Sequence, residues 1–322
     1  MRVFVTGATG FIGRHLCAHL VEHGHQVIAL LRTPAKASVL PEGCEIVQGD
    51  LSLFETDLEL PECEVVVHLA GIVTAEAPEQ YAAINRDAVG HLVACLQRQA
   101  WTPRRLVFAS SLAAAGPSPA DRPWTEDDAP APIDPYGEAK RDAEVLLRSA
   151  PFPTTSFRPP LVFGPEDPAT LTLYASAAKG VGVRVAGPPQ RLSWVDVRDA
   201  AAGIRLMVED EREGHRTYFL GSPAPTDLAK LWRALGDALG RGVLVLPLPR
   251  WLLYVAMRIA TAAASILGFH NQLDDKQFRQ MVAPAFVCSS AALERDLGWS
   301  ARHDLAACLA HAVAGYRAAG LL

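Results

Sequence analysis

Two residues four positions apart, Tyr136 and Lys140, carry side chains that could transfer a proton together. At this spacing both lie on one face of a helix, so both can point into a single cleft. A free phenol has a pKa of about 10, and bringing it near neutrality requires roughly 4 kcal/mol of preferential stabilisation of the phenolate. One cation about 4 Å away, at an effective dielectric constant near 20, supplies approximately that amount. The pair is therefore a candidate acid–base couple, although many surface helices share the spacing.

A glycine-rich turn near the start of the chain is the second candidate for chemistry. In "TGATGFIG", Gly7, Gly10 and Gly13 lie between a predicted strand at residues 2–6 and a predicted helix. Small residues there let the backbone turn tightly, approach a pyrophosphate and bring the helix against the sheet. The N–H groups and dipole of the helix N-terminus would then face the phosphates. The turn predicts a dinucleotide site, with a simple tight turn as the alternative.

The end of the second predicted strand indicates which dinucleotide would bind. Folds that prefer NAD usually carry an acidic residue there, which holds the ribose 2′-hydroxyl. Here Leu31 takes that position, Arg32 follows it and Lys36 is near. An arginine suits a 2′-phosphate, so we expect NADP, with NAD or a merely solvated arginine as alternatives. Asp50, after the third predicted strand, could accept from the adenine amino group or serve only in a turn.

The residues before position 112 contain the elements that must position these groups. Short apolar runs alternate with longer helical stretches, and the strand candidates are "RVFVT", "QVIALL", "CEIVQG", "EVVVHLAG" and "RRLVFASS". This alternation predicts an α/β fold, a Rossmann-type doubly wound parallel sheet with helices on both faces. A proline-rich stretch at 116–135 predicts a long surface loop directly before the helix of Tyr136. Loops of that length often border a site.

The strict alternation weakens after residue 165, which suggests two interleaved parts. We expect residues 1–165 to form the dinucleotide-binding domain, with 190–222 returning to it. Residues 166–189 and 223–322 would form a smaller C-terminal substrate-binding part.

Composition restricts the partners of the protein. The net charge of −5 and the lack of a basic run argue against nucleic acid as a partner. The six cysteines form no Cys-x-x-Cys pair, which argues against a zinc ribbon or a disulfide scaffold. His15 and His19 have the spacing of a metal pair but no matching carboxylate, so we expect no metal site. The first strand begins without a leader segment, and we expect a cytoplasmic protein that binds a small-molecule substrate.

The most hydrophobic segment of the chain covers residues 251–268. Arg258 interrupts it, and its length barely suffices to cross a bilayer. A buried or cap helix is therefore favoured over a membrane contact.

Several motifs occur in one order along nearly the whole chain. They are "TGATGFIG", "GDL" at 49–51, "HLAG" at 68–71, Asn85 opening a helix, "FASSLAAAG" at 108–116, "YGEAK" at 136–140, "RPPLVFGP" at 158–165 and "LGW" at 297–299. With them the chain resembles the extended short-chain dehydrogenase/reductase family. The resemblance implies Tyr136 as acid/base, Lys140 as its activator and Ser111 as the hydrogen-bond partner of the reacting oxygen.

The resemblance also implies which residues surround the cofactor. Ser110, the neighbour and rival of Ser111, would face the cofactor or the sheet. Asn85 would support a helix break and a water relay. Besides these, the glycine turn, Arg32, Asp50, Tyr136 and Lys140, the implied cofactor contacts are Thr9, Phe11, Ile12, Leu51, Leu69, Ala70, Gly71, Pro159 and Val162.

The substrate class is indicated by departures from the family pattern. Family members are mainly nucleotide-sugar enzymes or reductases of lipophilic ketones. Nucleotide-sugar enzymes commonly carry an asparagine where this chain has Leu161 and an arginine where it has Leu192. Dehydratases need an acidic pair where Leu112 and Ala113 stand, and the apolar "VLVLPLPRWLLYVAM" would suit a greasy pocket. We therefore favour an NADP-dependent oxidoreductase that interconverts a ketone and a secondary alcohol on a lipophilic small molecule.

Two alternatives stay open. One is a nucleotide-sugar epimerase that uses transient hydride transfer. The other is a non-catalytic cofactor-binding protein with a structural or regulatory role, a kind that often loses the tyrosine or lysine kept here. The resemblance also implies a homodimer paired through the helix after Asn85 and the helix of Tyr136, although an apolar face could equally pack on the chain's own sheet.

Overall fold

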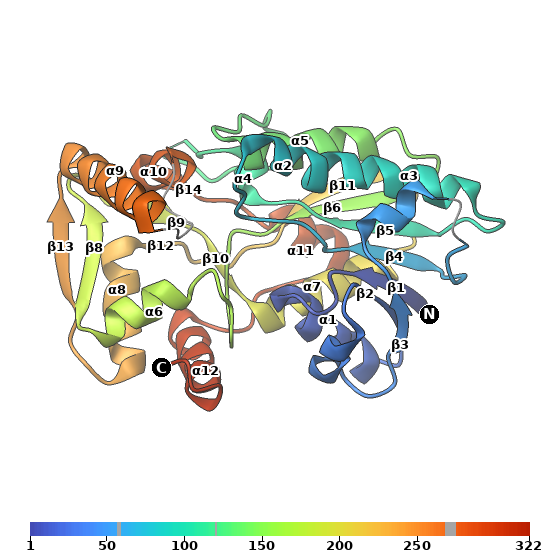
Figure 1. The fold of residues 1–322 in the computed structure, drawn as a ribbon, viewed down its shortest axis with the longest axis horizontal. Helices are drawn as coiled ribbons and strands as arrows, with labels where there is room; N and C mark the ends of the chain where they lie inside the picture. Colours follow the sequence, from blue (N-terminus) through green and yellow to red (C-terminus); the bar gives the residue numbers. More distant parts are fainter. Residues whose placement is uncertain (57–58, 120, 268–274) are drawn as a thin grey trace.

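The computed structural model describes residues 1–322 except 57–58, 120 and 268–274. Figure 1 shows an elongated molecule in which a sheet covered by helices occupies one half and a smaller group of helices and short strands occupies the other. The chain enters the second half with α6 and β8 (171–185), returns to the sheet with α7 and β11 (197–219), and enters the second half again with α8 (228–239), so the two halves are interleaved.

The larger half is built on a seven-stranded sheet with the strand order β11-β6-β5-β4-β1-β2-β3. All the neighbouring strands are parallel, as predicted from the alternation of strands and helices. The strands are β1 Arg2–Thr6, β2 Gln26–Leu31, β3 Glu45–Gln48, β4 Val65–His68, β5 Arg105–Ala109, β6 Thr154–Arg158 and β11 His215–Phe219. The order reverses between β1 and β4, and in doubly wound sheets ligands bind outside the carboxyl ends of the strands at such a point.

Helices cover both faces of this sheet (Figure 1). On one face, α1 (Phe11–Glu22), α7 (Val197–Glu209) and α11 (Ala291–Leu297) close a hydrophobic cluster with the strands. On the other, α3 (Ala88–Arg98) and α5 (Pro135–Leu147) close a second cluster, and α2 (Pro78–Ala82) packs on α5. Because both faces are covered, strands such as β4 are buried at every residue. The Rossmann-type fold is confirmed.

Short helices occur where the chain passes the carboxyl ends of the strands. They are the 3-10 helices η1 Pro34–Val39 and η2 Leu51–Glu55, the π-helix η3 Ala83–Asp87, and α4 Leu112–Ala115. The stretch from Gly116 to Asp134 contains no helix or named strand in its described part.

The smaller half has its own hydrophobic cluster. Helices α6 Leu171–Ala178, α8 Leu228–Leu239 and α12 Leu305–Ala318 form it around Trp194 and Trp232. Three small sheets connect this half to the larger one or extend it: β7 Leu161–Phe163 with β10 Trp194–Asp196, β9 Arg191–Leu192 with β12 Thr226–Asp227 and β14 Ala285–Phe286, and β8 Val181–Val185 with β13 Leu244–Leu248.

Helix α9 (Arg250–Leu267) covers the predicted hydrophobic segment apart from residue 268, which lies outside the described residues. Leu253 and Met257 attach it to Val185, and α10 (Asp275–Val282) follows it. Trp251 and Ile259 nevertheless point into solvent, so α9 is a cap helix with an exposed apolar face and is not buried. No helix in the described part of the chain has the length and hydrophobicity to cross a membrane.

Candidate active site

The first turn of α5 carries Tyr136. Asp134 caps this helix, since its Oδ1 accepts a hydrogen bond of 2.9 Å from the N–H of Gly137, and Pro135 occupies the first helical position. Tyr136 and Lys140 both face inward from α5 and are buried. The helix start therefore fixes the two side chains that were predicted to share a face.

Ser111 meets Tyr136 from the end of β5. It caps α4 by accepting from the N–H of Ala113 at 3.1 Å, and its side chain is hydrogen-bonded to the Tyr136 hydroxyl. Burial raises the pKa of Tyr136 to about 12, and the hydrogen bond with Ser111 opposes this rise. Without a cofactor, Tyr136 is therefore a neutral phenol at pH 7.

Lys140 is 4% exposed and is held by the end of the same strand. Its Nζ donates to the carbonyl of Ala109 at 2.7 Å and lies 4.8 Å from the centre of the Phe108 ring. Burial lowers the pKa of Lys140 to about 7, while the negative charge of Glu144 acts in the opposite direction. The amine therefore exchanges its proton near neutral pH, which few lysines do.

Asn85 links the end of β4 to this region. It is fully buried in the π-helix η3, and its amide bonds both backbone groups of Ile72, at 3.0 Å to the N–H and 2.9 Å to the carbonyl. A Cβ on Gly71 would lie only 2.6 Å from Asn85 Oδ1 and 3.2 Å from Lys140 Nζ. Gly71 therefore permits the close approach of Asn85 and Lys140. The π-helix is the helix break implied at Asn85.

The glycine turn forms a cradle before α1. Gly7 has φ of +71°, and a Cβ there would lie 2.6 Å from the backbone N of Ala70. A Cβ on Gly13 would overlap the carbonyl of Gly7. Gly10 caps α1 without a side chain, so the first N–H groups of the helix stay open to an anion. The cradle thus fits the pyrophosphate of a dinucleotide.

The residues expected to select the dinucleotide lie at the ends of β2 and β3. Leu31 is buried, whereas Arg32 and Lys36 are exposed. Asp50 is exposed, and its Oδ1 accepts from the Ser52 N–H at 2.9 Å and from the Ser52 hydroxyl at 2.5 Å. These bonds, aided by the charge of Arg32, lower the pKa of Asp50. Asp50 thus serves in a turn through Oδ1, while Oδ2 carries no bond among the described residues and the contact to the adenine amino group stays a prediction.

The other implied cofactor residues follow the same edge of the sheet. Thr9, Phe11 and Ile12 surround the cradle, Leu51 follows β3, and Leu69 to Gly71 follow β4. Pro159 follows β6 and Val162 lies in β7. Ser110 differs, because its hydroxyl donates to the carboxylate of Glu144. The Ser110 side chain therefore points toward Glu144 of α5.

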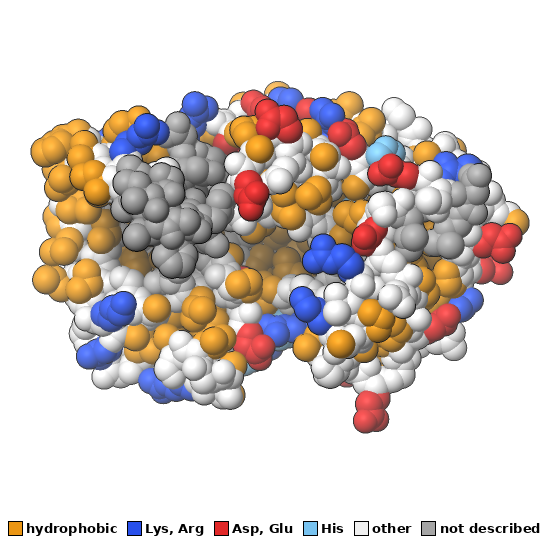
Figure 2. Space-filling view, viewed as in Figure 1, with side chains coloured by type: hydrophobic (Ala, Val, Ile, Leu, Met, Phe, Trp, Pro, Cys, Tyr) orange, Lys and Arg blue, Asp and Glu red, His pale blue; other side chains and the backbone are white. Residues whose placement is uncertain are grey.

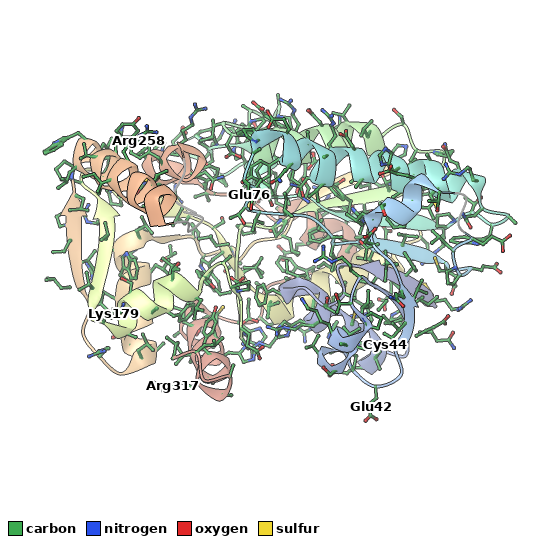
Figure 3. The ribbon with its side chains drawn as sticks, viewed as in Figure 1. Glu42, Cys44, Glu76, Lys179, Arg258 and Arg317 are labelled. Atoms are coloured by element: carbon green, nitrogen blue, oxygen red, sulfur yellow. The ribbon has the colours of Figure 1, made fainter. Side chains whose placement is uncertain are left out.

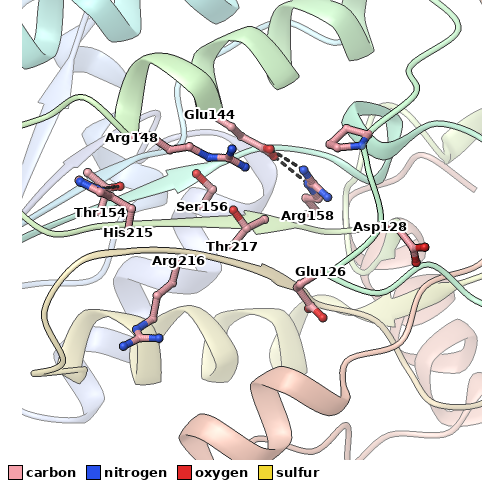
Figure 4. A pocket seen from close by; sticks show the side chains of 11 residues that line it. Glu126, Asp128, Glu144, Arg148, Thr154, Ser156, Arg158, His215, Arg216 and Thr217 are labelled. Carbon is pink, nitrogen blue, oxygen red and sulfur yellow. Dashed lines mark hydrogen bonds and ion pairs between the residues drawn. The ribbon is translucent and has the colours of Figure 1, made fainter.

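Glu144 and Arg158 form a buried ion pair that the sequence analysis missed. Arg158 donates from Nε and from a terminal nitrogen to the two carboxylate oxygens, at 2.9 and 2.6 Å. The pair lines a polar cavity of about 400 Å³ between α5, β6, β11 and the loop at 126–130, and Figure 4 shows both contacts. Tyr136 does not line this cavity. The position of Glu144 one turn after Lys140 puts both side chains on one helix face, but no sequence signal pairs Glu144 with Arg158.

Apolar and aromatic residues pack around Tyr136. The Tyr81 ring meets the Tyr136 ring edge-on with 5.9 Å between centres, and Ala113, Ile72 and Ala75 complete this cluster. Figure 2 shows a recess between the two halves of the molecule, with hydrophobic side chains inside it. Tyr81 was not among the residues predicted from the sequence.

The histidines at the end of α1 lie near a carboxylate, which was not expected for this helix. Among the described residues, His19, Glu22 and His23 form one group whose ligand atoms lie close together, with His19 Nδ1 4.0 Å from a Glu22 oxygen. The prediction concerned His15 with His19, whereas the carboxylate of Glu22 lies near His19 and His23. His15 is not part of the group, and burial lowers its pKa to about 4.

Comparison with known proteins places these residues in a family context. A family model described as "NAD dependent epimerase/dehydratase family" matches residues 3–221. The matched stretch contains the glycine turn, Asn85, Ser111, Tyr136 and Lys140.

Relatives with named activities include reductases. The chain is 27% identical over 329 residues to a ceramide reductase of Caulobacter vibrioides, covering 99% of this chain and 96% of that protein. It is 30% identical over 252 residues, covering 74% of each chain, to 4-hydroxy-2-methyl-3-oxo-4-farnesyl-3,4-dihydroquinoline-1-oxide ketoreductase of Stigmatella aurantiaca. A solved structure, MoeE5 in complex with UDP-glucuronic acid and NAD, matches with a TM-score of 0.75 at 22% identity, covering 99% of this chain and 100% of that one. This last likeness concerns the fold.

Proposed function

The chain belongs to the NAD dependent epimerase/dehydratase family, and on that premise we propose that it interconverts a ketone and a secondary alcohol on a lipophilic small molecule, with NADP as cofactor. Its relatives are NAD(P)-dependent reductases and epimerases, so the chain is an NAD(P)-dependent enzyme of one of these kinds. The observation that carries the proposal is the hydrogen bond between Ser111 and Tyr136, with Lys140 buried one turn along the same helix.

The proton step follows from the state of Tyr136. A phenol with a pKa of about 12 is protonated at neutral pH and can donate to the oxygen of a ketone. The nicotinamide, when bound, supplies the hydride that the carbonyl carbon accepts. Ser111 would hold the same oxygen by a second hydrogen bond. The alcohol then carries the phenol proton on oxygen, and Tyr136 is left as a phenolate.

Lys140 would stabilise that phenolate. Since burial has lowered its pKa to about 7, the amine is poised to gain a proton when a negative charge forms nearby. The resulting ammonium would lower the pKa of Tyr136 in return. At neutral pH, Tyr136 and Lys140 could therefore regain their protons from solvent easily.

A lipophilic substrate is supported by the surroundings of Tyr136. Aromatic and aliphatic residues pack on the Tyr136 ring, and the recess in Figure 2 carries hydrophobic side chains. The ceramide reductase and the farnesyl-quinoline ketoreductase act, by their names, on lipophilic molecules. Leu161 and Leu192, where nucleotide-sugar enzymes commonly have polar side chains, support the same class.

NADP is supported by the end of β2. Arg32 is exposed and makes no ion pair among the residues that the structure describes, and Lys36, which is also exposed, follows four residues later. An unpaired guanidinium can bind a 2′-phosphate at two points. No carboxylate at Leu31 would repel that phosphate.

The proposal is tested by measuring NADPH and NADH oxidation with a panel of long-chain ketones and, separately, binding of UDP-sugars. We expect turnover of a long-chain ketone and its loss in Tyr136→Phe, which removes the proton donor. Tyr174→Phe is the matched control, because this buried hydroxyl of the smaller half has no partner among the described residues.

Two results would favour the alternatives. Tight binding and epimerisation of a UDP-sugar would make the chain a nucleotide-sugar epimerase. Cofactor binding without turnover of any ketone or sugar would support the non-catalytic, cofactor-binding role, and activity that is unchanged in Tyr136→Phe would contradict the assignment of Tyr136.

A homodimer through α3 and α5 is part of the same proposal. Val145 and Leu146 on α5 are exposed although they are apolar, which supports a partner helix at this face. Val145→Glu should then convert a dimer to a monomer in sedimentation velocity. If the protein without this substitution sediments as a monomer, the dimer is ruled out.

A further inference from the structure

The end of the smaller half exposes a continuous apolar surface. It consists of α9, β13 and the start of β8, and we call it the apolar patch. Trp251 is 68% exposed, Leu244 65% and Ile259 64%. The patch residues are Val181, Leu244, Leu246, Trp251, Leu252, Tyr254, Val255 and Ile259. Figure 2 shows these hydrophobic side chains along one end of the molecule, over α9 and β13.

The arrangement of the patch is regular. Trp251, Val255 and Ile259 recur every four residues and therefore follow one stripe of α9. Leu253 and Met257 face the opposite way and pack on Val185 of β8. The helix thus has an apolar side turned to the protein and a second apolar side turned to solvent. Within the described residues nothing covers that second side.

The charges in the segments that form the patch have a single sign. Residues 168–195 carry Lys179, Arg184 and Arg191, and residues 238–273 carry Arg241, Arg250 and Arg258, with no Asp or Glu in either stretch. The chain as a whole is acidic, with a net charge of −5. Figure 3 labels Arg258 on α9 and Lys179 after α6, at opposite ends of this unit. The segments that form the apolar patch therefore carry positive charges and no negative ones, although Asp237 and Asp274–Asp275 flank them in the sequence.

We propose that the apolar patch docks on the surface of an anionic phospholipid bilayer. Exposed Trp and Tyr beside aliphatic residues suit the boundary between headgroups and acyl chains, and arginines around them suit anionic headgroups. A second copy of the chain fits less well, because a symmetric contact would bring the same arginines together. The docking lies along the surface, in keeping with the absence of a spanning helix in the described part.

The patch is connected to the site around Tyr136 by two contacts. The ring of Tyr254 packs edge-on against Phe278 of α10, with 5.1 Å between centres. Gln280 of the same helix donates from Nε2 to Asp134 Oδ2 at 2.7 Å, and Asp134 caps α5. The apolar patch and the helix that carries Tyr136 are therefore connected through α10. The docking itself does not depend on the proposed reaction.

The test is co-sedimentation of the full-length protein with vesicles. We expect binding to phosphatidylglycerol-containing vesicles, weaker binding to pure phosphatidylcholine, and release of the protein at about 1 M NaCl, where screening is strong. The double variant Trp251→Glu/Ile259→Glu should reduce binding on the order of tenfold or more. Leu321→Glu, which changes an exposed apolar residue near the C-terminus, should leave it unchanged.

A second variant guards against misfolding of the first. Arg250→Glu/Arg258→Glu changes two exposed charges and should weaken binding to the anionic vesicles alone. Failure of the unchanged protein to bind these vesicles at low salt overturns the proposal. So does an equal loss of binding in Leu321→Glu, or a change from dimer to monomer in the tryptophan–isoleucine variant, which would assign the patch to a second copy of the chain.

Discussion

Glu144 and Arg158 are paired at two points, 2.6 and 2.9 Å, in a place where both side chains are almost fully buried. The same carboxylate accepts a hydrogen bond from the Ser110 hydroxyl, and its negative charge raises the pKa of Lys140. One buried charge thus interacts with Ser110, the neighbour of Ser111, and with Lys140, one helical turn after Tyr136. Its position suggests that Glu144 adjusts the site without touching the substrate.

Glu144→Gln should lower stability and shift the pH profile. Arg158 would lose its buried partner, which costs about 3–5 kcal/mol of unfolding free energy. The pKa of Lys140 would fall further, because Glu144 now raises it, and less ammonium would be present at neutral pH. The pH dependence of kcat/KM should therefore move to lower pH. The control Glu138→Gln changes an exposed residue of the same helix and should change neither quantity. If Glu144→Gln lowers stability but leaves the pH profile of kcat/KM unchanged, Glu144 has a purely structural role.

The two serines should differ in which quantity they affect. Ser111→Ala removes the partner of the Tyr136 hydroxyl and should lower kcat by about 10²–10³-fold, as expected for loss of one donor to a reacting oxygen. Ser110→Ala removes a bond to Glu144 and should instead lower the unfolding free energy by about 1–3 kcal/mol. Steady-state kinetics and thermal unfolding of both variants separate these effects. If Ser110→Ala had the larger effect on kcat, the assignment of the serines would be reversed.

Arg32→Glu should reverse the preference between the two cofactors. Charge-assisted hydrogen bonds contribute about 1.5–3 kcal/mol, so loss of the contact to a 2′-phosphate corresponds to roughly 10- to 100-fold. The ratio of kcat/KM for NADPH to that for NADH is the quantity to measure. Arg317→Glu, on α12 and remote from β2, should leave the ratio unaltered. An unaltered ratio in Arg32→Glu would contradict the NADP preference.

Acid should destabilise the protein partly through His68. Burial lowers the pKa of this fully buried histidine to about 3, whereas the unfolded chain has a pKa near the ordinary value of 6.5. Between these values the unfolded state binds one more proton than the folded state, so stability is lost as the pH falls below 6.5. The loss from this group is about 1.4 kcal/mol per pH unit.

The comparison variant for this effect is His68→Gln. Its unfolding free energy should depend less steeply on pH between 6.5 and 5 than that of the unchanged protein. His91→Gln alters a half-exposed histidine and should retain the original slope. Equal slopes in all three proteins would show that His68 does not contribute.

Much of the fold was predictable because the relevant signals are local. Runs such as "RVFVT" and "QVIALL" coincide with β1 and β2, since continuous apolar strands between helices occur in buried parallel sheets. The proximity of Tyr136 and Lys140 followed from helical spacing, and that of Ser111 from the family resemblance. These signals each depend on neighbours in the sequence or on a known pattern.

The remaining features depend on pairings that no local pattern reveals. Glu144 and Arg158 lie on a helix and a strand, and nothing in the charge pattern shows which of many carboxylates and guanidinium groups are buried together. The same holds for Glu22 beside His19. Hydrophobicity alone also cannot show which side of α9 is covered, because apolar residues occur on both sides.

Asp134 uses its two oxygens for two halves of the molecule, since Oδ1 caps α5 and Oδ2 holds Gln280 of α10. The halves are therefore not independent modules. A chimaera that exchanges residues 223–322 for the matching part of a relative would keep the dinucleotide cradle but change the support of the helix that carries Tyr136. Substrate preference in such chimaeras should transfer fully only when a side chain able to donate to Asp134 is transferred with it.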